Sequence, residues 1–139
     1  MEWAVSAKEM KSCDSNTSSY YGIPSLVLME RAALRVVEAI GQEQLDTGRI
    51  LVVCGSGNNG GDGLAIARLL HLQGHKTAIL LAGDKKKFTP DAKVQYEICK
   101  KYQIPVISPV EFACQTYTLI IDAIFGIGLS RNISGSYAD

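Results

Sequence analysis

The first helix is predicted from a polar signal at the start of the chain. Ser6 followed by Glu9 is typical of a capping box, in which a serine begins a helix and a glutamate three residues later closes the cap. We expect this helix to run to about Asp14 and the polar stretch 15–21 to interrupt it. The chain therefore opens with a short helix followed by a polar connection.

The hydrophobic pattern then predicts a longer helix from Pro24, with Gly41 placed to end it. Its apolar residues recur three and four positions apart, which is the spacing of one buried stripe on a helix. The expected stripe is Leu26, Met29, Ala33, Val36 and Ile40.

From residue 50 onward, short apolar runs alternate with helical patterns. Residues 50–54 are continuously apolar and too few for a helix, as expected of a parallel strand covered on both faces. A glycine-rich turn follows, and then a helix over 64–73 that Gly74 can end. Thr89 and Pro90 are expected to begin another helix, with Asp91 in its first turn and Lys100 and Lys101 in its last. Further strands are predicted at 77–81, 105–107 and 119–121.

Strands that alternate with helices predict an α/β fold. We expect a Rossmann-like, doubly wound, mainly parallel sheet with helices on both faces. The 139 residues suffice for one domain, and no repeat or low-complexity linker divides them. Hydrophobic residues make up 47% of the chain, which is enough to bury a core.

Charge and cysteine content narrow the class of protein. The formal net charge is zero, so no overall field attracts nucleic acid or an anionic membrane, and neither is expected as a partner. The four cysteines contain no C-x-x-C pair, and Cys54 and Cys99 lie in apolar segments. This pattern favours reduced, buried thiols over disulfides or a zinc site. Because the N-terminus lacks the features of a signal peptide, we expect a cytoplasmic protein.

Two glycine-containing segments after predicted strands carry the candidate chemistry. Gly55, Gly57 and Gly60 satisfy G-x-G-x-x-G between a strand and a helix, where backbone N–H groups can approach a phosphate. Asn58, Asn59 and Asp62 add polar side chains to this loop, although Asx turns or a helix cap would explain them too. In such sheets ligands lie at the carboxyl ends of the strands. The first segment therefore predicts a ligand loop.

The second segment follows the strand predicted at 119–121. Asp122 closes this strand, and Gly126 and Gly128 form a flexible loop after it. A structural role for Asp122 as a loop cap is the alternative. Two glycine loops and a carboxylate at neighbouring strand ends predict one site.

These motifs together resemble a known family. The run Asn58-Asn59-Gly60-Gly61-Asp62-Gly63, then Ala67-Arg68, then Asp122-Ala123-x-x-Gly126-x-Gly128-Leu129, is similar to NAD(P)H-hydrate epimerase, the N-terminal domain of bifunctional bacterial repair enzymes. Met10, Asp14 and the run 28–32 resemble the opening helices of that family. The likeness extends over essentially the whole chain.

The resemblance implies that the protein interconverts the R and S forms of hydrated NADH or NADPH, and so feeds an S-specific dehydratase, fused or separate. It implies a potassium ion held by Asn59 and Asp122, and Asp122 as the catalytic acid and base. We also expect a homodimer. The implied substrate contacts are Asn58, Asn59, Gly60, Gly61, Asp62, Gly126, Ile127, Gly128, Leu129, Ser130, Arg131 and Asn132.

Two departures from the family pattern affect this expectation. The family often has threonine where Ile127 stands, which removes one hydroxyl contact. The family also continues into a strand that ends in an Asp-x-Pro-Ser-Gly type motif, which this sequence lacks. We therefore expect residues 1–139 to be an incomplete fragment of a single epimerase-like domain, with little activity.

Two other functions remain open at this stage. A non-catalytic dinucleotide-binding or scaffold module would use the same fold without the reaction. An NAD-dependent dehydrogenase is suggested by Asp84, which lies near the usual position of a ribose-binding acid. No catalytic histidine or lysine constellation accompanies it.

Overall fold

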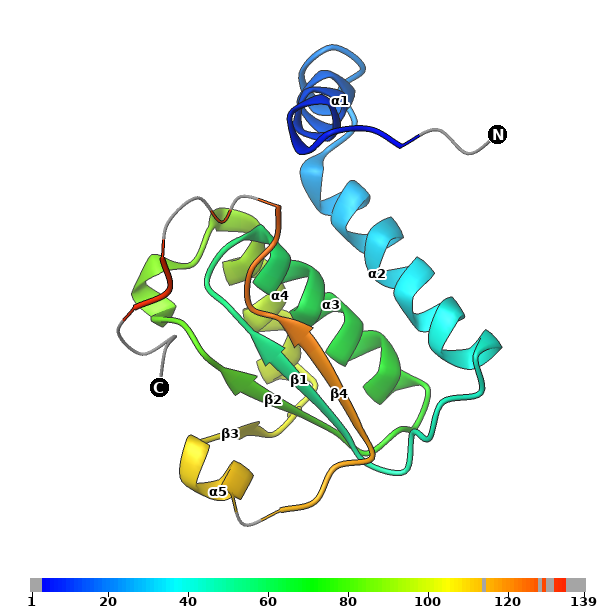
Figure 1. The fold of residues 1–139 in the computed structure, drawn as a ribbon, viewed down its shortest axis with the longest axis vertical. Coiled ribbons are helices and arrows are strands. Elements are labelled where there is room, and N and C mark those ends of the chain that lie inside the picture. Colours follow the sequence, from blue (N-terminus) through cyan, green and yellow to red (C-terminus); the bar gives the residue numbers. More distant parts are fainter. Residues whose placement is uncertain (1–3, 114, 128, 130–131, 135–139) are drawn as a thin grey trace.

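The computed structural model describes residues 4–113, 115–127, 129 and 132–134. Figure 1 shows the elements in chain order. They are α1 (Ala7–Ser19), α2 (Ser25–Gln42), β1 (Ile50–Cys54), α3 (Asn58–Leu72), β2 (Thr77–Leu81), the 3-10 helix η1 (Lys85–Lys87), α4 (Pro90–Lys101), β3 (Val106–Ile107), α5 (Pro109–Ala113) and β4 (Leu119–Ala123).

The four described strands form one parallel sheet in the order β3-β2-β1-β4. The chain moves outward from β1 to β2 and β3 through α3 and α4, and then returns to place β4 on the other side of β1. This reversal confirms the predicted doubly wound α/β class. Ligands in such folds bind where the strand order reverses, which here lies between β1 and β4.

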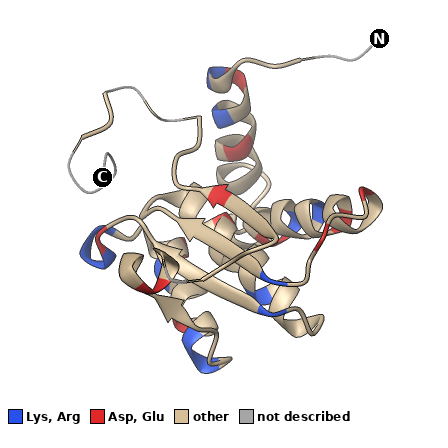
Figure 2. Cartoon of the chain, turned by 60° about the horizontal axis from the view of Figure 1, so that its bottom comes forward, with Lys and Arg blue, Asp and Glu red and all other residues tan. Residues whose placement is uncertain are grey.

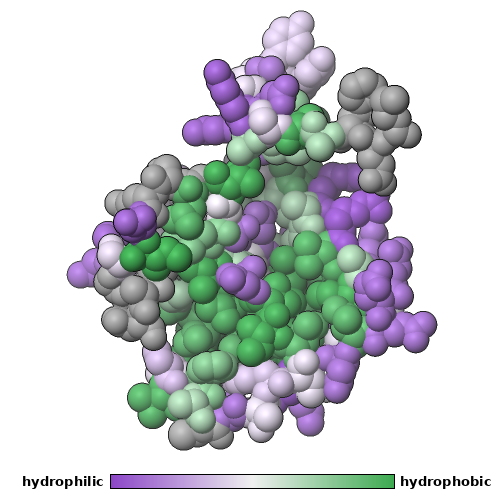
Figure 3. All heavy atoms as spheres, viewed as in Figure 1, coloured by the Kyte–Doolittle hydropathy of each residue, from purple (hydrophilic) through white to green (hydrophobic). Residues whose placement is uncertain are grey.

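The long helices lie in one layer on one face of the sheet. Figure 1 shows α3 along the sheet, with α2 and α4 on either side of it. Among the described residues no long helix covers the opposite face, although the sequence predicted helices on both. Figure 3 looks onto this face and shows a broad hydrophobic surface, and Ile120 of β4 is 54% exposed.

The core lies between the sheet and the helix layer. The helix α2 buries Met29, Ala33, Val37 and Ile40. The predicted stripe was wrong at one position, because Val36 is 39% exposed and Val37 takes the buried place four residues after Ala33. Cys54 and Cys99 are buried free thiols, as predicted, and burial raises the pKa of Cys99 to about 12.

The first helix is longer than its sequence predicted. Its capping box is confirmed, since the Ser6 N–H donates to Glu9 at 2.7 Å and the Glu9 N–H donates to the Ser6 hydroxyl at 3.3 Å. The helix continues past Asp14 to Ser19, however. The hydroxyls of Thr17 and Ser19 donate to carbonyls four residues earlier, so these polar side chains are accommodated within the helix.

The start of α4 and the end of α3 agree with the predicted signals. Thr89 caps α4, with Asp91 in the first turn and Lys100 and Lys101 in the last. Gly74 follows α3 with φ of 91°, a conformation that favours glycine. Figure 2 shows acidic and basic residues on several elements, and three lysines in succession form η1 (Lys85–Lys87). No helix within the described residues is long and apolar enough to cross a membrane.

Candidate functional site

The predicted asparagine- and glycine-rich loop is largely helical. The helix α3 begins at Asn58, six residues before the predicted start at Leu64, and only Gly55 to Gly57 form the turn after β1. The prediction failed because glycine and asparagine have poor helix propensity. Close packing outweighs that propensity in this fold.

The distances around three glycines show how close the packing is. A Cβ on Gly60 would lie 1.9 Å from the Gly55 carbonyl oxygen, and one on Gly63 would lie 2.5 Å from the Ala123 Cβ. On the other side of the helix, a Cβ on Gly61 would lie 2.6 Å from the Met29 Cε. These glycines therefore allow α3 to approach the β1 turn, the end of β4 and α2. The contacts with substrate predicted for Gly60 and Gly61 stay a prediction.

Gly57 differs from these packed glycines. It is exposed, its φ is −84°, and a Cβ built on it would meet no atom within 4 Å. Neither packing nor backbone conformation therefore requires glycine at this position. Gly57 is also the N-cap of α3 and makes no side-chain cap hydrogen bond, which leaves amides of the first turn open to an anion.

The structure brings the two predicted segments together. The Gly55 N–H donates to the Ala123 carbonyl at 3.0 Å, so the β1 turn is bonded directly to the end of β4. A Cβ on Gly126 would lie 3.2 Å from the Asn59 Cβ. The start of α3 and the segment after β4 thus adjoin at the carboxyl ends of β1 and β4, where folds of this class are expected to bind ligands in a crevice.

Asp122 lies in β4 opposite Val53, one residue before the strand ends. Its side chain is exposed, and its Oδ1 accepts a hydrogen bond from the Ile124 N–H at 3.0 Å. That bond is the structural role that the sequence left as an alternative, because it stabilises the turn toward Gly126. This hydrogen bond involves one of the two carboxylate oxygens of Asp122, and its ligand role stays a prediction.

Asp62 is the carboxylate in this region whose pKa is most perturbed. It is partly buried in α3, and burial, together with the nearby negative charge of Asp14, raises its pKa from 3.8 to about 6. A group that titrates near neutral pH can both accept and donate a proton. The sequence predicted that Asp62 belongs to the site. It did not predict the raised pKa, because the influence of Asp14 on Asp62 depends on where α1 lies relative to α3.

The segment after β4 is exposed where it is described. Gly126, Ile127, Leu129 and Asn132 are all exposed, with Ile127 at 68%. The predicted contacts Gly128, Ser130 and Arg131 lie outside the described residues.

Two further observations bear on the chemistry. The described residues contain no group of three or more His, Cys, Asp or Glu side chains that could hold a metal ion. The Asp84 Oδ1 accepts from the Lys86 N–H at 2.9 Å and so caps η1. This capping role accounts for Asp84 without a ribose, and it weakens the dehydrogenase alternative.

Comparison with known proteins finds similar sequences and similar solved structures. A family model described as YjeF-related protein N-terminus matches residues 25–139. A Limosilactobacillus fermentum protein named NAD(P)H-hydrate epimerase is 50% identical over 137 residues, covering 99% of this chain and 65% of that protein. A protein of the same name from Weissella koreensis is 47% identical, covering 94% of this chain and 58% of its own.

The crystal structure of yeast ynu0 has the same fold, with a TM-score of 0.81 and 26% sequence identity. The match covers 96% of this chain and 60% of the yeast chain. The chain thus spans about three fifths of the length of the relatives it matches.

Proposed function

The chain belongs to the YjeF-related protein N-terminus family, and we propose that it epimerises the hydrated forms of NADH and NADPH. The names of its bacterial relatives support this substrate class. The observation that carries the proposal is the meeting of the open N-terminus of α3, Asn59 and Gly126 at the crevice between β1 and β4.

In this proposal the dinucleotide phosphates lie at the N-terminus of α3. The helix is 15 residues long, so the partial positive charge at its N-terminus is fully developed and favours an anion. Gly57 leaves space for the phosphates, and Asn58 is exposed beside it. Residues 126–132 would cover the ligand from the β4 side.

The proposed cation is potassium, held by the Asn59 amide oxygen and the Asp122 carboxylate. These groups bring amide and carboxylate oxygens with one formal negative charge, which suits a monovalent ion better than magnesium or zinc. When bound, the ion would supply positive charge beside the substrate. Asn59 and Asp122 would then also hold the start of α3 against the end of β4.

The proposed reaction inverts the carbon of the nicotinamide ring that carries the added hydroxyl. A protonated carboxyl group donates its proton to the departing hydroxyl, which leaves as water while the ring nitrogen forms a double bond to that carbon. Water then adds to the opposite face and returns a proton to the carboxylate, so protons and oxygen balance. Asp122 was the predicted acid and base, and the raised pKa of Asp62 makes it a second candidate.

Two proposed partners follow from the reaction and the fold. A dehydratase that accepts only the S form would consume the product. A second copy of the chain is the proposed homodimer partner, because the outer edge of β4 is unpaired among the described strands and Ile120 beside it is exposed.

An assay of turnover and binding separates an epimerase from a binding module. The purified R hydrate is incubated with the chain in potassium buffer, and chromatography follows the appearance of the S form against the spontaneous rate. Binding is measured in parallel by calorimetry. The same measurements are made on a chain extended through the family's remaining strand. Faster appearance of the S form with either chain supports the proposal, and tight binding at the spontaneous rate by both chains would establish a non-catalytic module instead.

A further inference from the structure

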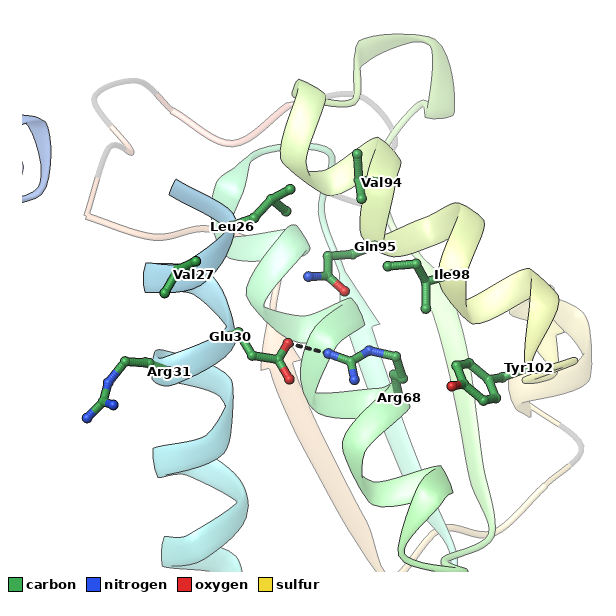
Figure 4. A pocket seen from close by; sticks show the side chains of 9 residues that line it. All are labelled: Leu26, Val27, Glu30, Arg31, Arg68, Val94, Gln95, Ile98 and Tyr102. Atoms are coloured by element: carbon green, nitrogen blue, oxygen red, sulfur yellow. Dashed lines mark hydrogen bonds and ion pairs between the residues drawn. The ribbon is translucent and has the colours of Figure 1, made fainter. Parts of the chain in front are cut away.

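A cavity lies on the helix side of the molecule, away from the open face of the sheet. Its volume is about 430 Å³, within the range of about 300–1,000 Å³ that is usual for small-molecule sites. Figure 4 shows it between α2 and α4, with α3 as its floor. Apolar side chains form most of its wall, among them Leu26, Val27, Val94, Ile98 and Tyr102.

Two residues that line this cavity, Arg68 and Gln95, each have a buried polar atom without a hydrogen-bond partner among the described residues. Gln95 is 3% exposed, yet its Oε1 accepts no hydrogen bond. The side chain of Arg68 is 12% exposed and pairs with Glu30, but its Nε donates to no acceptor. Figure 4 shows the Gln95 amide directed from α4 toward this ion pair. A buried polar group without a partner is unfavourable, so a ligand that satisfied both groups would gain binding free energy from them.

The charges around these atoms favour a neutral ligand. Arg68 and Glu30 neutralise one another, and Figure 4 shows Arg31 directed away from the cavity. A ligand carrying its own charge would therefore lose its hydration without a free counterion. The ligand needs one donor for Gln95 Oε1, one acceptor for Arg68 Nε, and an apolar body for the walls. A primary amide on an aromatic ring meets all three requirements.

We propose that this cavity is a binding site for neutral aromatic carboxamides, separate from the crevice between β1 and β4. Arg68 lies nine residues after Asn59 on α3, which places it about 14 Å farther along the helix at a rise of about 1.5 Å per residue. The proposal does not depend on epimerase activity, because the residues that line this cavity differ from those of the proposed epimerase site at the ends of β1 and β4.

In the test, benzamide is titrated into the 139-residue chain, and NMR follows the chemical shifts of the backbone amides. Toluene serves as the probe without the amide, and benzoate as the charged probe. We expect benzamide to shift the amides of Arg68 and of residues 26–31 and 94–102, and to bind more tightly than either comparison probe. Gln95→Leu should weaken benzamide binding at least about fivefold, the equivalent of one lost hydrogen bond.

The matched control is Gln42→Leu, which makes the same change at an exposed residue of α2 and should leave benzamide binding unaltered. Ile98→Phe provides a second test if Gln95→Leu fails to fold, because it fills the cavity without altering its polar atoms. It should abolish the benzamide shifts. The proposal is overturned if benzamide shifts none of these amides, if toluene or benzoate binds equally well, or if Ile98→Phe leaves benzamide binding unchanged.

Discussion

Replacing Asp62 with asparagine should stabilise the fold at pH 8 and have little effect at pH 4. The pKa of Asp62 is about 6 in the folded chain and 3.8 as its ordinary value, because burial and the charge of Asp14 disfavour the ionised form. A raised folded-state pKa contributes stability that is fully present below pH 3.8 and is lost as the pH rises through about 6. At pH 8 the native protein therefore holds an unfavourable negative charge that asparagine removes.

The size of the effect follows from the pKa difference. A rise from 3.8 to about 6 corresponds to about 3 kcal/mol when it is fully expressed. Asp62 is only partly buried, and solvent screening reduces this to about 1–2 kcal/mol. For a chain of this length we expect a rise of about 3–6 °C in Tm at pH 8.

Urea and thermal unfolding from pH 4 to pH 8 would measure the difference between Asp62→Asn and the parent chain. Asp14→Asn should give part of the gain at pH 8, since it removes the second cause of the raised pKa. Glu43→Gln, which neutralises an exposed carboxylate at the end of α2, is the matched control and should change little. A constant difference between Asp62→Asn and the parent chain across this pH range would refute the reasoning.

Four further predictions concern packing, the turn after β1 and the proposed ion. Gly60→Ala should cost about 3 kcal/mol or more of unfolding free energy, because its Cβ would lie 1.9 Å from a backbone oxygen. Gly57→Ser should leave urea stability intact, since serine is a good N-cap, but should weaken calorimetric dinucleotide binding about tenfold by occupying the α3 amides. Val37→Ala should cost about 2 kcal/mol in urea unfolding and Val36→Ala much less, because only Val37 is buried. Epimerisation should be faster in potassium than in sodium buffer, and equal rates would argue against an ion at Asn59 and Asp122.

The sequence predicted those parts of the fold that depend on local patterns. The strand over 50–54, the capping box at Ser6 and the cap at Thr89 were all confirmed. Hydrophobic runs and capping residues act over a few positions, so the chain alone reveals them. The class of fold followed from their alternation.

The errors arose where tertiary contacts outweigh local preference. Asn58 to Gly63 have the composition of a loop but form the start of α3, because their glycines allow close contact with β4 and α2. Local sequence patterns were also insufficient to predict how the residues of the candidate site are arranged. The adjoining positions of Asn59 and Gly126, and the effect of Asp14 on Asp62, join residues far apart in sequence.

The most direct test of the account is the rate of R-to-S interconversion by Asp122→Asn, made in a chain extended through the family's remaining strand, with binding measured on the same samples. The amide keeps the shape of the side chain and the oxygen that accepts from Ile124, but it loses the charge and the exchangeable proton. We predict that the rate falls to near the spontaneous value while the affinity for the hydrate changes by less than about tenfold. An unchanged rate in Asp122→Asn, with an equally unchanged rate in Asp62→Asn, would contradict catalysis by these carboxylates at the crevice between β1 and β4.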